Sequence, residues 1–304
     1  MSSPRADLLD PAAVSALGHL EMVARWVVDG FLTGLHRSPR KGFSVEFAEH
    51  RPYQPGDDLR YLDWRIAARA DRWVVKQFEE ETNTRAMLVL DVSASMHWTG
   101  ALNRLTKLAY AERLLGALAL LFLRQRDAVG LVRADTGVRS VVPPGSRDGH
   151  WFRLAAALAQ AGGGPGTDLI AALTQAAHFT RRPGFIVLAS DLLVEPEPVI
   201  EQVRALRARG HEVLVLHILD PLERDFPEGG EALFTDPESR TAVPASPADV
   251  RRDYRATVEH ALAQWRTELL RHGARYTLAF TDTPFGDPLR AVVRASGRGP
   301  MPIA

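Results

Sequence analysis

Hydrophobic and polar positions from residue 85 onward fall into two alternating kinds of segment. Short continuous apolar runs, such as AMLVLD and GFIVLASD, are typical of strands that are buried on both faces. Longer segments with apolar residues at steps of three and four predict helices. Strands are predicted at 86–91, 127–134, 137–142, 184–191, 211–220 and 275–282. Helices are predicted at about 102–124, 147–161, 169–179, 195–210, 249–272 and 287–295.

This alternation predicts an α/β fold with a doubly wound, largely parallel sheet and helices on both faces. The run GVRSVV is short and half-polar, which is typical of an edge strand. The chain divides into an N-terminal helical or accessory segment over 1–84 and a main α/β domain over 85–304. Within the main domain, a Pro-, Gly- and acid-rich stretch at about 221–248 contains EALFTDPESRTAV, which predicts a small hairpin insertion.

Composition excludes several classes of function. The 304 residues carry no net charge at pH 7, whereas a non-specific nucleic-acid binder usually has a basic excess. The absence of cysteine excludes disulfides, thiolate nucleophiles and Cys-ligated zinc. The longest apolar run, Leu114 to Leu123, is much shorter than the roughly 20 residues that span a bilayer. We therefore expect a cytoplasmic protein with no membrane span.

Oxygen-bearing side chains gather where the predicted strands end. Asp91, Ser93 and Ser95 follow the first strand in DVSAS, Thr167 ends the glycine-rich run GGGPGT, and Asp191 closes GFIVLASD. In an open α/β sheet, ligands bind at the carboxyl ends of the strands, so we expect these five residues to converge. They offer oxygen ligands alone, which suit Mg²⁺, Ca²⁺ or Mn²⁺.

The balance of this oxygen set indicates how such a site could work. Two carboxylates nearly neutralise a divalent ion, and neutral hydroxyls complete its shell without adding negative charge. The bound ion should then accept one more oxygen, and we expect this to be an acidic side chain of another protein. The sequence therefore predicts a Mg²⁺ site at Asp91, Ser93, Ser95, Thr167 and Asp191 with no catalytic residues.

Two other interpretations stay open from the residues, and a phosphate-binding loop is set aside. Asp91 and Ser93 could cap the following helix and bond the loop backbone, which would leave a scaffold with a vestigial metal site. A metal-dependent hydrolase is a second possibility, although a general base is needed near the ion and His97 is the one His or Glu within these motifs. The glycine-rich run lacks the Lys-Ser/Thr ending of a phosphate-binding P-loop.

The order and spacing of DVSAS, the Thr of GTD and the Asp of ASD resemble the metal-ion-dependent adhesion site of von Willebrand factor A domains. Upstream, the pattern Arg51-x-Tyr53-x-Pro55-Gly56-Asp57-Asp58-x-Arg60-x-x-Asp63-Trp64 is similar to the bacterial domain-of-unknown-function family fifty-eight. That resemblance covers roughly residues 40–290. The interleaved arginines and aspartates of this stretch are interpreted as an ion-pair network, as a protein-docking surface or as a nucleic-acid patch. The last is opposed by the aspartates, which repel phosphate.

The second resemblance implies a function for the whole chain. Members of this family are usually encoded beside MoxR-type AAA+ ATPases. The resemblance therefore implies a von Willebrand factor A-like, non-enzymatic interaction module that acts as an adaptor for a MoxR-type AAA+ ATPase or for its client protein. Many members carry N-terminal membrane helices, whereas this chain resembles the soluble branch.

Overall fold

The computed structural model describes residues 20–25, 27–28, 50–52, 73–76, 84–226, 232–235 and 241–295. Most of the predicted accessory segment over 1–84, including nearly all of the arginine- and aspartate-rich pattern that begins at Arg51, lies outside these residues. Within that segment, β1 (His50–Pro52) pairs with β2 (Val74–Lys76) in an antiparallel ribbon.

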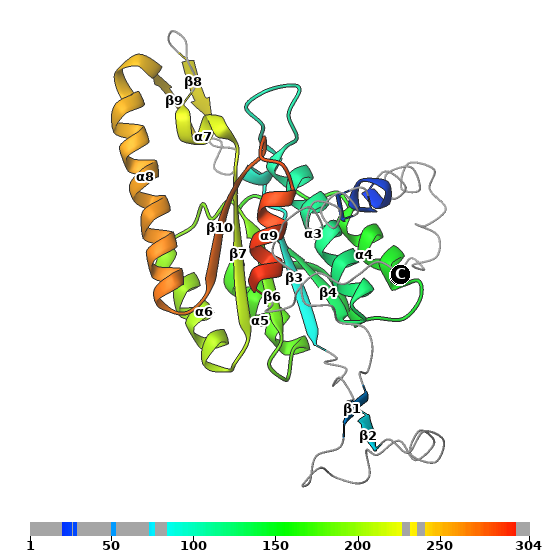
Figure 1. Cartoon of the computed structure of the whole chain (residues 1–304). Coiled ribbons are helices and arrows are strands. Elements are labelled where there is room, and N and C mark those ends of the chain that lie inside the picture. The colour runs from blue at the N-terminus through cyan, green and yellow to red at the C-terminus, as the bar shows by residue number, and fades with distance from the viewer. Residues whose placement is uncertain are drawn as a thin grey trace.

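A six-stranded sheet forms the centre of the molecule (Figure 1), with the strand order β10-β7-β6-β3-β4-β5. Its strands are β3 (Arg85–Asp91), β4 (Ala128–Ala134), β5 (Val138–Gly145), β6 (Phe185–Ser190), β7 (Glu212–Leu219) and β10 (Arg275–Phe280). Neighbouring strands are parallel except for β5, which pairs antiparallel with β4 at one edge. The predicted α/β fold with a largely parallel sheet is confirmed.

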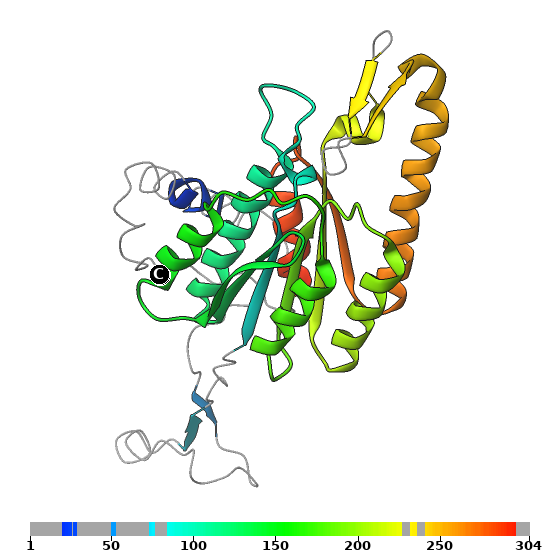
Figure 2. The same ribbon diagram turned by 180° about the vertical axis from the view of Figure 1, so that it is seen from behind.

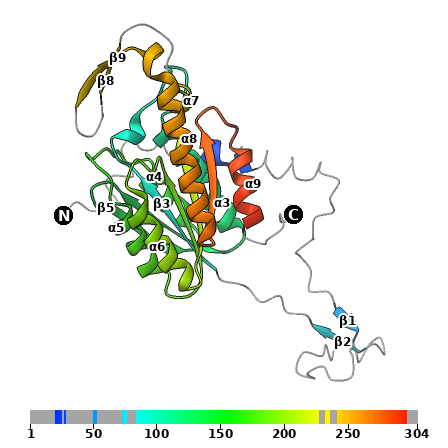
Figure 3. The same cartoon turned by 90° about the vertical axis from the view of Figure 1, so that its left-hand side faces the viewer.

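Helices cover both faces of this sheet, as Figure 1 and the opposite view in Figure 2 show. Side chains along β3 alternate between two hydrophobic cores, since successive residues of a strand point to opposite faces: Leu88 and Leu90 belong to one core, Met87 and Val89 to the other. The first core is completed by α3 (Lys107–Arg124), α4 (His150–Leu158), α9 (Gly286–Ala295) and the helical residues 20–25. The second core is completed by α5 (Leu169–Phe179), α6 (Pro196–Ala208) and α8 (Pro247–Arg271). In Figure 3, β10 lies between α8 and α9.

The helix after β3 begins later than its apolar pattern predicts. The expected start near Leu102 is wrong, because α3 begins at Lys107 and the hydroxyl of Thr106 caps it by accepting from the N–H of Ala109 at 3.1 Å. Leu102 instead lies fully exposed in the loop 98–106. This loop is fixed to another part of the chain, since the N–H of Gly100 donates to Asp220 Oδ2 at 3.1 Å.

The predicted hairpin insertion is present, and a short helix precedes it. Strands β8 (Ala232–Thr235) and β9 (Ala242–Ala245) pair antiparallel. The helix α7 (Pro221–Asp225) follows β7 directly and begins with a capping box formed by Asp220 and Glu223. Figure 1 places α7 and the hairpin at the end of the sheet where the parallel strands finish.

No helix in the described parts of the chain combines the length and the apolar character needed to cross a bilayer.

Candidate functional site

The candidate site lies where the strand order reverses. From β3 the chain first adds β4 on one side and later adds β6 on the other, and in open α/β sheets ligands bind outside the carboxyl ends of the strands at such a point. Asp91 is the last residue of β3, and Asp191 directly follows β6. Parallel pairing of β3 with β6 therefore brings the two predicted carboxylates to one edge.

Asp91 is fully buried and is bonded by neutral donors. Its Oδ1 accepts from the N–H of Ser93 at 2.9 Å, and its Oδ2 accepts from the hydroxyl of Ser190 at 2.6 Å. Burial, followed by the nearby charge of Asp191, raises the pKa of Asp91 to about 6, although the bonds from Ser190 and Ser93 favour the ionised form. A cation at this edge would relieve both effects.

The two serines of DVSAS lie beside one another. The hydroxyl oxygens of Ser93 and Ser95 are 3.1 Å apart, and both side chains are buried. The short 3-10 helix at Ser95–His97 has Ala94 at its N-cap and no side-chain capping bond. The capping alternative is wrong, because Thr106 caps α3 and no side chain caps the 3-10 helix, whereas Asp91 does bond the loop backbone at Ser93.

The glycine-rich loop that carries Thr167 lies against the DVSAS loop. Ser93 forms a parallel β-bridge with Gly164, and the N–H of Ala94 donates to the Gly164 carbonyl at 3.0 Å. Thr167 is half-buried in this loop, next to Asp168, whose side chain caps α5. The structure thus brings together Asp91, Ser93, Ser95 and Asp191, and places Thr167 only through its loop.

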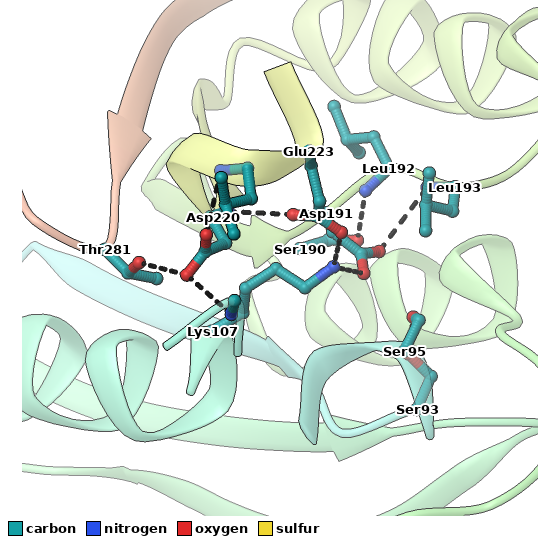
Figure 4. Close-up of polar contacts among 12 residues, drawn as sticks. Ser93, Ser95, Lys107, Ser190, Asp191, Leu192, Leu193, Asp220, Glu223 and Thr281 are labelled. Atoms are coloured by element: carbon teal, nitrogen blue, oxygen red, sulfur yellow. Dashed lines mark hydrogen bonds and ion pairs between the residues drawn. The ribbon is translucent and has the colours of Figure 1, made fainter. Parts of the chain in front are cut away.

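Asp191 forms an ion pair with a lysine that the sequence did not indicate. The ammonium of Lys107 donates to Asp191 Oδ2 at 2.8 Å and also to Glu223 of α7. Figure 4 shows the Lys107 side chain extending from α3 with its nitrogen between these two carboxylates. Burial lowers the pKa of Lys107, but Asp191 and Glu223 outweigh it and leave the pKa above its ordinary value. Lys107 is therefore charged at neutral pH.

The rarity of lysine is visible in the sequence, whereas the position of Lys107 at a helix start is known only from the structure. The chain has 37 basic residues, and three of them are lysines. Lys107 is the first residue of α3, where the helix dipole disfavours a positive charge. A cation at that position requires carboxylates from elsewhere, and these come from residues more than 80 positions away.

The backbone after Asp191 is held in an unusual conformation. Leu192 has a φ of 53°, in the left-handed region that a non-glycine residue rarely adopts. Its N–H donates to Ser190 Oγ at 3.0 Å, and its side chain is buried in the second core. The side chain of Leu192 therefore anchors the turn that carries Asp191.

His217 supports Asp191 from β7 and was also missed. Its Nε2 lies 2.8 Å from the Asp191 carbonyl oxygen and its Nδ1 lies 2.8 Å from the Tyr276 hydroxyl. Burial lowers the pKa of His217 to about 4, with Asp191 acting in the opposite direction. The imidazole is therefore neutral, so Nε2–H donates to the carbonyl and Nδ1 accepts from the tyrosine.

These side chains fit a hard divalent cation in their chemistry. Asp91, Ser93, Ser95 and Asp191 present oxygen atoms alone, which is the donor type that Mg²⁺ and Ca²⁺ prefer. Asp91 is buried beside a second carboxylate without a cation of its own among the described contacts. Asp191 differs, since Lys107 already holds one of its oxygens.

Solved structures with a similar fold include BatB from Bacteroides thetaiotaomicron and the SpRpn10 VWA domain. The first is 15% identical, with a TM-score of 0.45 and coverage of 70% of this chain and 99% of that chain. The second is 10% identical, with a TM-score of 0.40 and coverage of 68% of this chain and 93% of that chain.

Similar sequences are found among mycobacterial proteins of unassigned function. The uncharacterized proteins Rv1480 of Mycobacterium tuberculosis and Mb1516 of Mycobacterium bovis are each 34% identical over 240 residues, which cover 77% of this chain and 74% of each relative. Residues 49–264 match the family described as "Protein of unknown function DUF58". The chain therefore belongs to the DUF58 family.

Proposed function

We propose that this protein is a non-enzymatic, divalent-metal-dependent protein-interaction module of the von Willebrand factor A type. Mg²⁺, or Ca²⁺ or Mn²⁺ in its place, would be held by Asp91, Ser93, Ser95, Thr167 and Asp191. The observation that carries the proposal is the environment of Asp91. This carboxylate is fully buried beside Asp191, yet among the described contacts its hydrogen-bond donors are neutral.

The chemistry of the ligand set suggests how a partner would be recognised. Ser93 and Ser95 supply neutral oxygens, so the bound cation would keep part of its positive charge. An acidic side chain from another protein would be attracted to that charge and would complete the shell. Two exposed hydrophobic side chains are available to contact the same partner. Trp98, three residues after Ser95, is 38% exposed, and Leu193, two residues after Asp191, is 60% exposed.

The polar groups near Asp191 support binding rather than catalysis. A hydrolase at this edge would need a general base, but both nitrogens of His217 are already hydrogen bonded and Lys107 is paired with two carboxylates. His97 is exposed and lies near Gly163 of the glycine-rich loop. It is the residue that a hydrolase mechanism would have to use.

The proposed partner is a MoxR-type AAA+ ATPase or its client protein, and the proposed location is the cytoplasm. The partner follows from the family resemblance alone, and the location from the short apolar runs together with the cysteine-free composition. A scaffold with a vestigial metal site is the alternative that the ion pair between Lys107 and Asp191 favours, because that pair already neutralises one of the two carboxylates.

A binding assay with an isosteric variant tests the proposal. The tagged chain is mixed with a purified MoxR-type ATPase from the same genome, in Mg²⁺ and in a chelator, and Mn²⁺ binding is measured separately by calorimetry. Asp91→Asn removes one of the two negative charges of the site, and Asp148→Asn, at an exposed loop position, is the matched control.

We expect Asp91→Asn to lose Mn²⁺ binding and partner capture, and Asp148→Asn to keep both. Capture that is equal in Mg²⁺ and in chelator would support the scaffold alternative and contradict metal dependence. Turnover of a model phosphoester that disappears in Asp91→Asn and in His97→Ala would support the hydrolase alternative.

A further inference from the structure

Lys107 occupies a position that is unfavourable for a cation unless carboxylates hold it there. Its side chain is 1% exposed, and burial of an ammonium group is costly without paired charges. It is also the first residue of α3, where the helix dipole opposes a positive charge. Asp191 and Glu223 offset both effects through direct hydrogen bonds.

The charges around Lys107 do not balance. Asp91, Asp191 and Glu223 supply three carboxylates, and Lys107 supplies one ammonium group. Arg104 does not join them, because it pairs with Asp220 at 3.2 Å. The formal charge of the group is therefore minus two when all four side chains are ionised, and this equals the charge that one divalent cation would neutralise.

We propose that Lys107 is a built-in competitor of the divalent cation for Asp191. This inference rests on the function proposed above. While the ammonium holds Asp191 Oδ2, that oxygen is not free for a metal ion, and a charge of the same sign lies next to the cation site. Like charges at short range repel strongly in a low-dielectric interior. Lys107 thus lowers the affinity of the site for the ion.

Glu223 is the second carboxylate that holds Lys107, and it links the lysine to α7 and α8. Its Oε1 holds Lys107, its Oε2 accepts from the N–H of Asp220, and its carbonyl accepts from the hydroxyl of Tyr254 on α8. If a divalent ion displaces the ammonium from Asp191, Glu223 remains as its partner. Cation binding is therefore coupled to α7, which precedes the β8–β9 hairpin in the chain.

The test is calorimetric titration of the full chain with Mn²⁺. Lys107→Met keeps the length and the apolar part of the side chain and removes the charge. Arg104→Met is the matched control, since it removes a neighbouring positive charge that contacts Asp220 rather than Asp191. Lys107→Met combined with Glu223→Gln removes one charge of each sign, so the net charge of the group is unchanged.

We expect Lys107→Met to bind Mn²⁺ at least about tenfold more tightly than the native chain, because the competing charge is gone. Arg104→Met should stay within about threefold of the native value. The double variant should also bind more tightly than the native chain, since Asp191 is free although the net charge is unchanged. If Lys107→Met alone fails to fold, as judged by circular dichroism, the double variant provides the test.

The failures of the two proposals can be told apart. If the native chain binds Mn²⁺ and the lysine variants bind it equally or more weakly, the competition is wrong and the metal site stands. If the native and variant chains are folded and none of them binds Mn²⁺, both the proposed metal site and the proposed competition by Lys107 are wrong. In native protein, amide exchange along 221–225 should also change on addition of Mn²⁺, and no change there would contradict the coupling to α7.

Discussion

Two buried aspartates at the same edge of the sheet have opposite surroundings. Asp91 is the last residue of β3, and Asp220 directly follows β7. Both side chains are 0% exposed. Asp220 accepts from the N–H groups of Gly100 and Leu222, from the Thr281 hydroxyl and from Arg104. Asp91 accepts from Ser93 and from the Ser190 hydroxyl, which are neutral donors, and it faces a second carboxylate.

The difference separates a carboxylate with a structural role from one to which the proposed function assigns cation binding. Asp220 has a cation and enough donors for both oxygens, so its burial stabilises the junction of β7, α7 and the loop 98–106. Asp91 has no such cation among the described contacts, and burial makes its ionised form unfavourable. A buried aspartate alone therefore does not mark a candidate site, whereas one that lacks a counter-charge beside a second carboxylate does.

Removal of Asp220 should have the largest effect on stability. Asp220→Ala leaves Arg104, two N–H groups and the Thr281 hydroxyl without their acceptor. Breaking a buried ion pair in this way costs about 3–5 kcal/mol, so we expect the free energy of unfolding in urea to fall by that amount. A loss below about 1 kcal/mol would remove the distinction between the two aspartates.

Neutralising Asp91 should stabilise the metal-free protein. Its pKa of about 6, against 3.8 for the ordinary group, corresponds to about 3 kcal/mol that the ionised form loses on folding. In chelator at pH 8, Asp91→Asn should therefore raise the free energy of unfolding by up to about 3 kcal/mol. A divalent cation should reverse the order, because it stabilises only the native carboxylate.

The difference in unfolding free energy between Asp91→Asn and the native chain should depend on pH. Since the folded pKa of Asp91 lies above its unfolded value, folding binds a proton, and the native chain loses stability as pH rises from about 4 through about 6. Asp91→Asn lacks this contribution, so the stability difference between variant and native chain should be small at pH 4 and constant above about pH 7. Urea unfolding at each pH measures it, and a difference that does not change with pH would contradict the raised pKa.

A smaller effect is expected where α3 begins. Thr106→Ala removes the acceptor for the N–H of Ala109, and loss of such a cap costs about 1 kcal/mol. Because Thr106 directly precedes Lys107, the substitution also tests whether the capped helix start helps to position the Lys107 ammonium group. Thr106→Ser, which retains the hydroxyl, is the control and should recover most of the lost stability in thermal unfolding.

The smallest stability effect is expected at Leu193. Its side chain is 60% exposed, and surface substitutions usually change stability by less than about 0.5 kcal/mol. Leu193→Ser should therefore unfold like the native chain while it weakens capture of the partner several-fold in the binding assay. Equal capture by the two chains would exclude Leu193 from the interaction surface.

Most of the fold could be predicted from the sequence because its strands are buried on both faces. Continuous apolar runs mark β3, β6 and β7 directly, and the half-polar run of β5 indicated an edge strand. The start of α3 was misplaced because Leu102 and Leu105 continue the apolar spacing, while a single hydroxyl at Thr106 sets the boundary. The short α7 was missed, although its Asp220-Pro-Leu-Glu223 start is a capping-box pattern.

The candidate site was predicted through local motifs, and its counter-charges were not. Asp91, Ser93 and Asp191 each end or follow a recognisable strand, so their convergence follows from the parallel order. The ion pair of Lys107 with Asp191 joins residues 84 positions apart, and no local spacing encodes it. Metal binding and the role of Thr167 stay predictions.

The turn at Leu192 has a consequence for how the site responds to a ligand. A leucine in the left-handed region costs about 1–2 kcal/mol, and burial of its side chain in the second core offsets that cost. The backbone turn that carries Asp191 is therefore held by hydrocarbon packing before any ligand binds. Little backbone ordering entropy is then lost on binding, although the Asp191 carboxylate must still exchange Lys107 for the ligand.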